Sequence, residues 1–187
     1  MKSRREKSSP RKMKKVFVVF CEGETEECYL NFLRATYRSP IKVIPRISGD
    51  SINERIIREA QKSERITDSE KITTFVMYDL DKADMNERLK ALDAIHLFSN
   101  PCVELWFLLH VVEQRQGLTT AAAIKALVNA GGVWMNYNKP ILTQTQRAFL
   151  WEHRLKAIEH AKVLKENTNP SSTIYKLLES LEQSIMK

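Results

Sequence analysis

The segment Ile72-Thr73-Thr74-Phe75-Val76-Met77-Tyr78-Asp79-Leu80-Asp81 decides the fold and carries the strongest chemical signal in the chain. Its β-branched and aromatic residues predict a buried strand. Side chains alternate between the faces of a strand, so Asp79 and Asp81 are expected to point the same way where it ends. Two close carboxylates repel each other, and a hard cation such as Mg²⁺ would neutralise them. The alternative is that Asp79 ends the strand and Asp81 or Asp84 caps the next helix without a bound ion.

Three further apolar segments predict the neighbouring strands: residues 16–21, 41–47 and 94–98. Segments of helical periodicity separate the strands, so the order predicts an α/β fold. We expect a parallel four-stranded sheet with right-handed crossovers, helices on both faces and additional C-terminal helices. One domain is expected over residues 16–187, with an α/β core at 16–113 and a helical extension at 114–187.

Capping residues predict where the helices begin. Thr25 is expected to cap the first helix, Ser51 the second, and Asn100 the helix after the fourth strand. Periodic apolar residues predict one continuous helix over residues 143–164. A last helix is predicted to start at Ser171 or Ser172.

Acidic residues follow two of the predicted strands directly. Glu22 comes after the first strand, and Asp79 and Asp81 come at the end of the third. The carboxyl ends of parallel strands meet at one edge of a sheet, so these acids are expected to lie close together. Glu104, in an apolar helix that starts at the same edge, is a further candidate carboxylate. Its alternative role is a first-turn acid that the helix dipole favours.

The net charge of +7 is confined to the start of the chain. Residues 1–15 hold eight basic residues and one acid, whereas the remainder holds 22 of each sign. We expect a disordered basic tail whose Lys12, Lys14 and Lys15 contact nucleic-acid phosphates, or which is simply solvated. Lys139, in an aromatic loop, is a candidate contact for a scissile phosphate. Trp134 and Tyr137 in the same loop are expected to anchor it, and stacking on nucleic-acid bases is their alternative role.

Several classes of protein are disfavoured by the sequence. No apolar run is long enough to span a membrane, and no apolar segment follows the basic start as in a signal peptide, so a cytoplasmic protein is expected. The three cysteines lack CxxC spacing, and the four histidines are scattered, so zinc and redox sites are not expected. Nucleotide hydrolysis by a P-loop is not expected either, because the motif is missing from the sequence.

Four elements of the sequence together resemble the RloB-like family. They are Phe17-Val18-Val19-Phe20-Cys21-Glu22-Gly23-Glu24-Thr25-Glu26, Tyr78-Asp79-Leu80-Asp81, Ser99-Asn100-Pro101-Cys102-Val103-Glu104-Leu105-Trp106-Phe107-Leu108-Leu109-His110, and Asn169-Pro170-Ser171-Ser172-Thr173. The third element is the most specific of these. The first and third also look like the Toprim domain of topoisomerases, primases and OLD-type nucleases.

The resemblance implies roles for particular acids. In Toprim proteins the glutamate after the first strand acts as acid/base or metal ligand, which corresponds to Glu22. The DxD pair binds Mg²⁺ there, which corresponds to Asp79 and Asp81. OLD-type nucleases add a glutamate four residues after the first, matching Glu26, and further acids beyond the DxD, for which Asp84 is a candidate by position.

The resemblance also implies a function. RloB-like proteins are encoded near restriction and abortive-infection loci, often beside an ATPase. We therefore expect a Mg²⁺- or Mn²⁺-dependent nuclease in phage defence, with nucleic acid and an ATPase as partners and a homodimer as one assembly form. The alternative is a non-catalytic adaptor or nucleic-acid-binding subunit of a defence complex. A DxD nucleotide-sugar transferase is a weaker option, because it usually needs a larger nucleotide-binding domain.

Overall fold

A computed structural model describes residues 15–37, 42–63 and 71–185 of the chain. Its centre is a five-stranded sheet in the order β2-β1-β3-β4-β5. The strands are β1 (Lys15–Cys21), β2 (Lys42–Ile47), β3 (Lys71–Asp79), β4 (Ile95–Asn100) and β5 (Ser171–Ser172). The first four are parallel, as predicted, and β5 is antiparallel to β4. The mixed α/β architecture is consistent with the expected Toprim-like fold.

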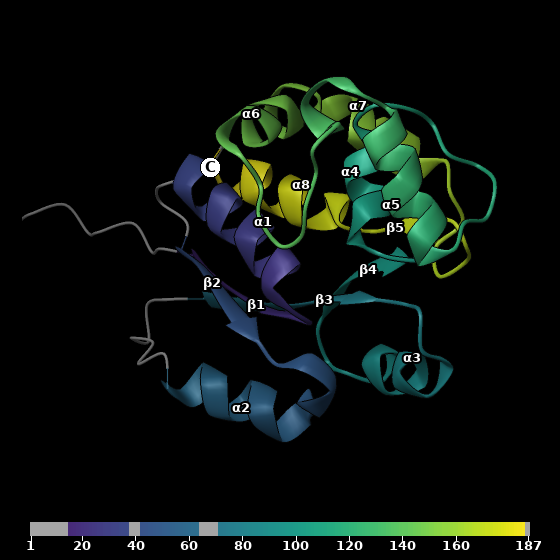
Figure 1. Cartoon of the computed structure of the whole chain (residues 1–187). Coiled ribbons are helices and arrows are strands. Elements are labelled where there is room, and N and C mark those ends of the chain that lie inside the picture. Colours follow the sequence, from purple (N-terminus) through teal and green to yellow (C-terminus); the bar gives the residue numbers. More distant parts are fainter. Residues whose placement is uncertain (1–14, 38–41, 64–70, 186–187) are drawn as a thin grey trace, which may run out of the picture.

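Helices cover both faces of the sheet (Figure 1). They are α1 (Glu24–Thr36), α2 (Glu54–Ser63), α3 (Ala83–Lys90), α4 (Val103–Leu109), α5 (Thr120–Asn129), α6 (Gln144–Glu152), α7 (Arg154–Lys162) and α8 (Tyr175–Ile185). Helices α2 and α3 lie on one face, and the other helices lie on the opposite face (Figure 1). Two short 3₁₀ helices, Gly49–Ser51 and Gly132–Trp134, precede α2 and α6.

Strand β1 shows why the sheet needs cover on both sides. Val16, Val18 and Phe20 pack into the core beneath α2 and α3, whereas Phe17 and Val19 pack into the larger core beneath α1 and the C-terminal helices. A continuous apolar run is expected for a parallel strand that is buried on both faces.

The register of β1 and β3 positions the candidate site. Cys21 pairs with Met77, so the two strands end almost level with each other. The chain then leaves β1 at Glu22 and β3 at Asp79. These two residues therefore emerge side by side at the carboxyl edge of the sheet, as the parallel topology predicts.

Several predicted helix starts were wrong by a few residues. Helix α1 begins after Gly23, and Thr25 is buried inside its first turn. Asn53 caps α2, since its Oδ1 accepts a hydrogen bond from the Ile56 N–H at 3.1 Å. Asn100 is the last residue of β4, and Cys102 precedes α4.

The C-terminal half also differs from the prediction in two places. The predicted continuous helix over residues 143–164 is interrupted at His153, which separates α6 from α7. Ser171 and Ser172 form β5 instead of starting the last helix, which begins at Tyr175.

A threonine between β5 and α8 ties the C-terminal segment to the sheet. The Thr173 N–H donates to the Phe98 carbonyl at 2.8 Å. Its Oγ1 accepts from the Phe98 N–H at 2.8 Å and donates to the His96 carbonyl at 2.9 Å. The segment after β5 thus satisfies main-chain groups of β4 that would otherwise be buried without partners.

The structure bears on membrane spans and on the cysteines. No helix in the described ranges is both long enough and apolar enough to cross a bilayer. Cys21, Cys28 and Cys102 are all free thiols, and Cys21 and Cys102 are buried, as expected for small packed side chains.

Candidate active site

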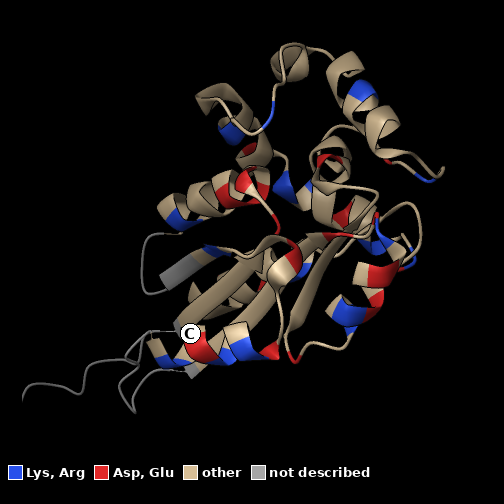
Figure 2. Ribbon diagram, turned by 60° about the horizontal axis from the view of Figure 1, so that its bottom comes forward, with Lys and Arg blue, Asp and Glu red and all other residues tan. Residues whose placement is uncertain are grey.

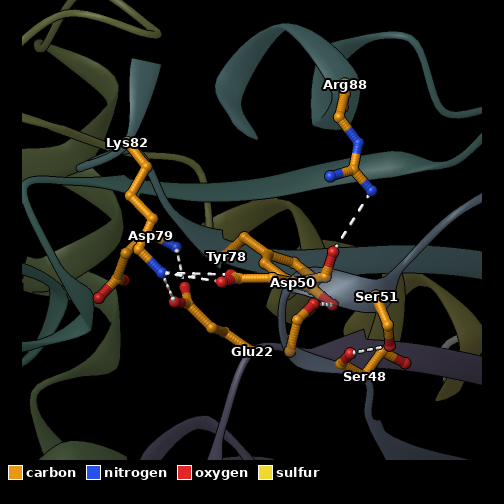
Figure 3. A network of polar contacts seen from close by, with 9 residues as sticks. Glu22, Ser48, Asp50, Ser51, Tyr78, Asp79, Lys82 and Arg88 are labelled. Carbon is orange, nitrogen blue, oxygen red and sulfur yellow. Dashed lines mark hydrogen bonds and ion pairs between the residues drawn. The ribbon is translucent and has the colours of Figure 1, made fainter. Parts of the chain in front are cut away.

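Glu22 and Asp79 are joined by one hydrogen bond at the ends of β1 and β3. The Glu22 N–H donates to the Met77 carbonyl at 3.2 Å, which extends the ladder by one residue. The Asp79 N–H in turn donates to Glu22 Oε2 at 3.2 Å (Figure 3). The two acids, 57 positions apart in sequence, therefore meet as predicted.

Glu26 joins this pair from the first turn of α1. Its Oε2 accepts a hydrogen bond from the Gly23 N–H at 3.2 Å, so the side chain folds back toward the start of the helix. The side chain is only 6% exposed. Burial raises the pKa of the Glu26 carboxyl, its own main-chain N–H partly offsets this, and the charges of Glu22 and Glu104 raise it further.

Burial and the charges of Glu26, Glu22 and Glu104 all raise the pKa of the Asp79 carboxyl. Burial is the largest cause that raises the pKa of its carboxyl well above the usual range, followed by the charges of Glu26, Glu22 and Glu104. The nearby Lys139 ammonium acts in the opposite direction. Glu22, Glu26, Asp79 and Glu104 therefore form one electrostatic group, which we call the acid cluster.

Glu104 is the most deeply enclosed member of the acid cluster, with no exposed surface. It lies in the first turn of α4. Its Oε1 accepts hydrogen bonds from the Tyr137 hydroxyl at 2.8 Å and from the Lys139 ammonium at 2.8 Å. Its Oε2 is buried and has no hydrogen-bond partner among the described residues. Such an oxygen is costly to bury unless a further ligand satisfies it.

Tyr137 and Lys139 come from the loop between α5 and α6, residues 131–143. Gly131 and Gly132 reverse the chain at φ values of +73° and +56°, which other residues rarely adopt. Trp134 is buried and stacks on Phe107 of α4 with ring centroids 5.8 Å apart. The prediction that Trp134 anchors this loop is therefore confirmed, and the anchor sets the loop against the helix that carries Glu104.

A second lysine, Lys82, pairs with Glu22. The Lys82 ammonium is 3.7 Å from Glu22 Oε1 and 3.2 Å from Asp50 Oδ1 (Figure 3). Arg88 donates to the Asp50 carbonyl at 3.3 Å. The Asp79 carboxylate points away from Asp50 in the close-up view (Figure 3).

Two residues of this site, Asp50 and Lys82, were missed in the sequence, and so was the contact of Tyr137 with Glu104. Asp50 follows β2, so the rule that parallel strands end at one edge could have placed it beside Glu22. Lys82 directly follows the DxD segment, where a cation is a natural partner for acids. Tyr137 is expected as a loop aromatic, but nothing local in the sequence indicates that its hydroxyl reaches Glu104.

Other predicted site residues lie outside the acid cluster. Asp81 is exposed beyond the buried Leu80, and its charge acts on Lys82. Asp84 is exposed in the first turn of α3. Lys15 begins β1, and its side chain is not among those described; residues 12 and 14 lie outside the described ranges.

Charges of both signs meet at the carboxyl edge of the sheet. Figure 2 shows acidic residues of several segments gathered near this edge, with lysines and arginines between them. Within the described residues, no three His, Cys, Asp or Glu side chains are close enough together to form a ready metal centre. Any cation bound here would be held by fewer protein ligands or after a rearrangement of side chains.

The donor chemistry nevertheless fits a hard divalent cation. The acid cluster offers carboxylate oxygens, which Mg²⁺ prefers, and Mg²⁺ usually keeps several waters and takes only one or two carboxylates. The unpartnered Glu104 Oε2 supplies an oxygen that needs a ligand. Glu22, Glu26, Asp79 and Glu104 are the residues that could hold such an ion.

Comparison with known proteins gives a family match. The family model described as RloB-like protein matches residues 17–181, which includes every member of the acid cluster and the loop with Lys139. No curated protein matches the chain, and no solved structure matches it.

Proposed function

The chain belongs to the RloB-like family, and from this premise we propose that it is a Mg²⁺- or Mn²⁺-dependent nuclease of Toprim type that hydrolyses phosphodiester bonds. One observation carries the proposal most directly. Glu104 is wholly buried, its charge acts on Glu26 and Asp79, and one of its oxygens has no partner among the described residues. Acids whose charges act on one another, with a buried oxygen unsatisfied, are typical of sites that bind a cation.

The acid cluster by itself would repel a polyanion. A bound divalent ion would supply positive charge, polarise the scissile phosphate and make a water more acidic. Glu22 and Asp79 would hold the ion, with Glu26 and Glu104 completing the set. Asp81 and Asp84 receive no role in this proposal.

Protein groups supply proton transfer and phosphate contacts in this scheme. In the metal-free chain the pKa values of Glu26 and Asp79 are raised, and a bound divalent ion would lower them again, so both carboxylates would be charged in the loaded site. A carboxylate of the cluster that does not contact the ion would be suited to accept a proton from an attacking water. Lys139 lies 41% exposed at the edge of the cluster, where its ammonium can contact a phosphate oxygen.

The test is cleavage of plasmid DNA, single-stranded DNA and RNA by the full chain with Mg²⁺, with Mn²⁺ or with EDTA. We expect cleavage only with a divalent ion. Glu22→Gln and Asp79→Asn should each slow it by about a hundredfold or more. Glu59→Gln and Asp93→Asn are matched controls on the surface and should cleave normally. Undiminished cleavage by Asp79→Asn would overturn the assignment.

A non-catalytic adaptor is the second candidate, and one observation favours it. Lys82 and Lys139 already pair with Glu22 and Glu104, so part of the acidic charge is neutralised within the chain. Calorimetric titration with Mn²⁺ separates the two candidates. The absence of both a heat of binding and a thermal shift would support the adaptor.

The proposed biological setting is phage defence together with a partner ATPase, and it rests on the family resemblance. Plaque counts on cells that express the native chain or Asp79→Asn, each with the neighbouring ATPase gene, would test it. Equal protection by both versions would favour an adaptor in the defence complex.

A further inference from the structure

Lys139 is the cation with the widest influence on the acid cluster. Its ammonium pairs with Glu104 Oε1 at 2.8 Å, and its charge lowers the pKa values of Glu26 and Asp79. It therefore acts on three of the four acids that the proposed function assigns to a divalent ion. A divalent ion and an ammonium group would repel each other at the same carboxylate.

The two oxygens of Glu104 have different partners. Tyr137 and Lys139 both bond to Oε1, whereas Oε2 has no partner among the described residues. A cation bound at Oε2 would not compete with the Tyr137 hydroxyl for Oε1. Glu104 is fully buried and fixed on a helix, but Lys139 is 41% exposed and can turn into solvent.

The loop around Lys139 is anchored on both sides of the lysine. Trp134 and Tyr137 are buried before it, and a β-bridge joins Asn138 to Ile141 across it. Met135 and Ile141 remain largely exposed at the surface of the loop. The lysine side chain can therefore change partner without unfolding the segment that holds it.

Lys82 does not have the same dependence on the acid cluster. Its ammonium is closer to Asp50, at 3.2 Å, than to Glu22, at 3.7 Å. Loss of the Glu22 contact would leave Lys82 with its nearer partner. The ion pair of Lys139, by contrast, is with Glu104 of the acid cluster.

We propose that Lys139 is an exchangeable counter-ion: it neutralises Glu104 in the metal-free chain and leaves Glu104 when a divalent ion binds. This rests on the proposed function, because it assumes that the acid cluster takes a cation. Its consequence is that the lysine becomes free to contact a substrate phosphate once the ion is in place. Binding of the divalent ion would then determine whether the Lys139 ammonium is available to contact a substrate phosphate.

Isothermal titration of the full chain with Mn²⁺ tests the exchange. Lys139→Met removes the competing ammonium, so we expect Mn²⁺ to bind about tenfold tighter. Lys125→Met, at an exposed position on α5, is the matched control and should bind as the native chain does. Equal or weaker binding by Lys139→Met would overturn the exchange.

The possible outcomes separate this inference from the proposed function. Mn²⁺ binding of equal strength to the native chain and to Lys139→Met refutes the exchange alone. Binding to Lys139→Met but not to the native chain supports a strong block by the lysine. Binding to neither refutes both the metal site and the exchange.

A second measurement uses the unaltered chain and does not depend on how well a variant folds. Acetylation by an N-hydroxysuccinimide ester, followed by peptide mass spectrometry, reports how freely each lysine reacts. We expect the Lys139 rate to rise severalfold on addition of Mn²⁺, while the Lys125 rate stays the same. An unchanged Lys139 rate in the Mn²⁺-bound chain would contradict its release from Glu104.

Discussion

Asp79 carries a charge that the folded chain disfavours. Burial and three neighbouring glutamates raise the pKa of its carboxyl, so the folded state holds a proton at pH values where the unfolded chain has lost it. Stability then falls as pH rises, because the folded state binds more protons than the unfolded state over this interval. The interval begins near pH 4, the usual pKa of an aspartate, which is about 3.9, and extends to the raised pKa of the folded chain.

A prediction at the residue scale follows for Asp79→Asn. In EDTA the variant should have nearly the native stability at pH 4 and should exceed it at pH 8, because Asn at this position carries no charge to bury. Urea denaturation at several pH values measures the difference. Asp93→Asn, an exposed control, should keep the native pH dependence, and a parallel curve for Asp79→Asn would show that the repulsion at Asp79 is small.

Asp79→Asn should lose nuclease activity while its free energy of unfolding at pH 8 increases. Functional sites commonly hold groups that a more stable chain would not place together. The opposite result, a variant that is both inactive and less stable at pH 8, would indicate that Asp79 serves the fold.

At the scale of elements, the sequence predicted the four parallel strands and the meeting of Glu22 with Asp79. Both follow from one rule, because apolar runs identify the strands and parallel topology brings their ends together. The β5 strand was not predicted, since two serines carry no strand signal of their own. It exists because the segment around Thr173 satisfies the backbone of β4.

The candidate site was only partly predictable, because some of its contacts depend on packing between segments that are distant in the sequence. Glu104 was identified as a carboxylate at the correct edge, but its contact with Tyr137 depends on how the loop packs over α4. The alternation that aligns Asp79 with Asp81 holds within a strand, and β3 ends at Asp79. Beyond that residue the strand periodicity no longer applies, and Asp81 lies exposed.

A prediction at the element scale concerns Thr173→Val. The change removes the partner of the buried Phe98 N–H and one donor to the His96 carbonyl, so we expect a loss of about 1–3 kcal/mol in the free energy of unfolding. Thr168→Val removes a hydroxyl at the surface and should cost less than about 0.5 kcal/mol. Thermal or urea unfolding compares the two, and equal small effects would mean that β5 adds little to the sheet.

At the scale of the whole molecule, charge is divided between two regions. The acid cluster lies at the carboxyl edge of the sheet, and the excess positive charge of the sequence lies in residues 1–15. A nuclease of this kind would use the basic residues for sequence-independent attraction and the cation site for chemistry. The salt dependence of nucleic-acid binding can therefore be separated from cleavage.

A prediction at this scale uses three lysines of the basic segment. Lys12→Gln, Lys14→Gln and Lys15→Gln combined should reduce the slope of log affinity against log salt by about 2–3, if each lysine contacts one phosphate. Fluorescence anisotropy with labelled DNA or RNA measures the slope, in an Asp79→Asn background that prevents cleavage. Gln at the exposed Lys62, Lys125 and Lys165 is the matched control, and equal slopes would remove these three lysines from the nucleic-acid interface.

The short antiparallel β5 also affects how outside peptides can attach to this protein. In the described part of the chain the sheet margins are β2 and β5, and β5 is a strand of only 2 residues that pairs with the Ser99 and Asn100 end of β4. The longer margin open to strand addition is therefore β2, in which Pro45 has no N–H to donate. A peptide inhibitor that works by main-chain pairing would form its longer ladder beside β2, the strand that leads to Asp50 of the site.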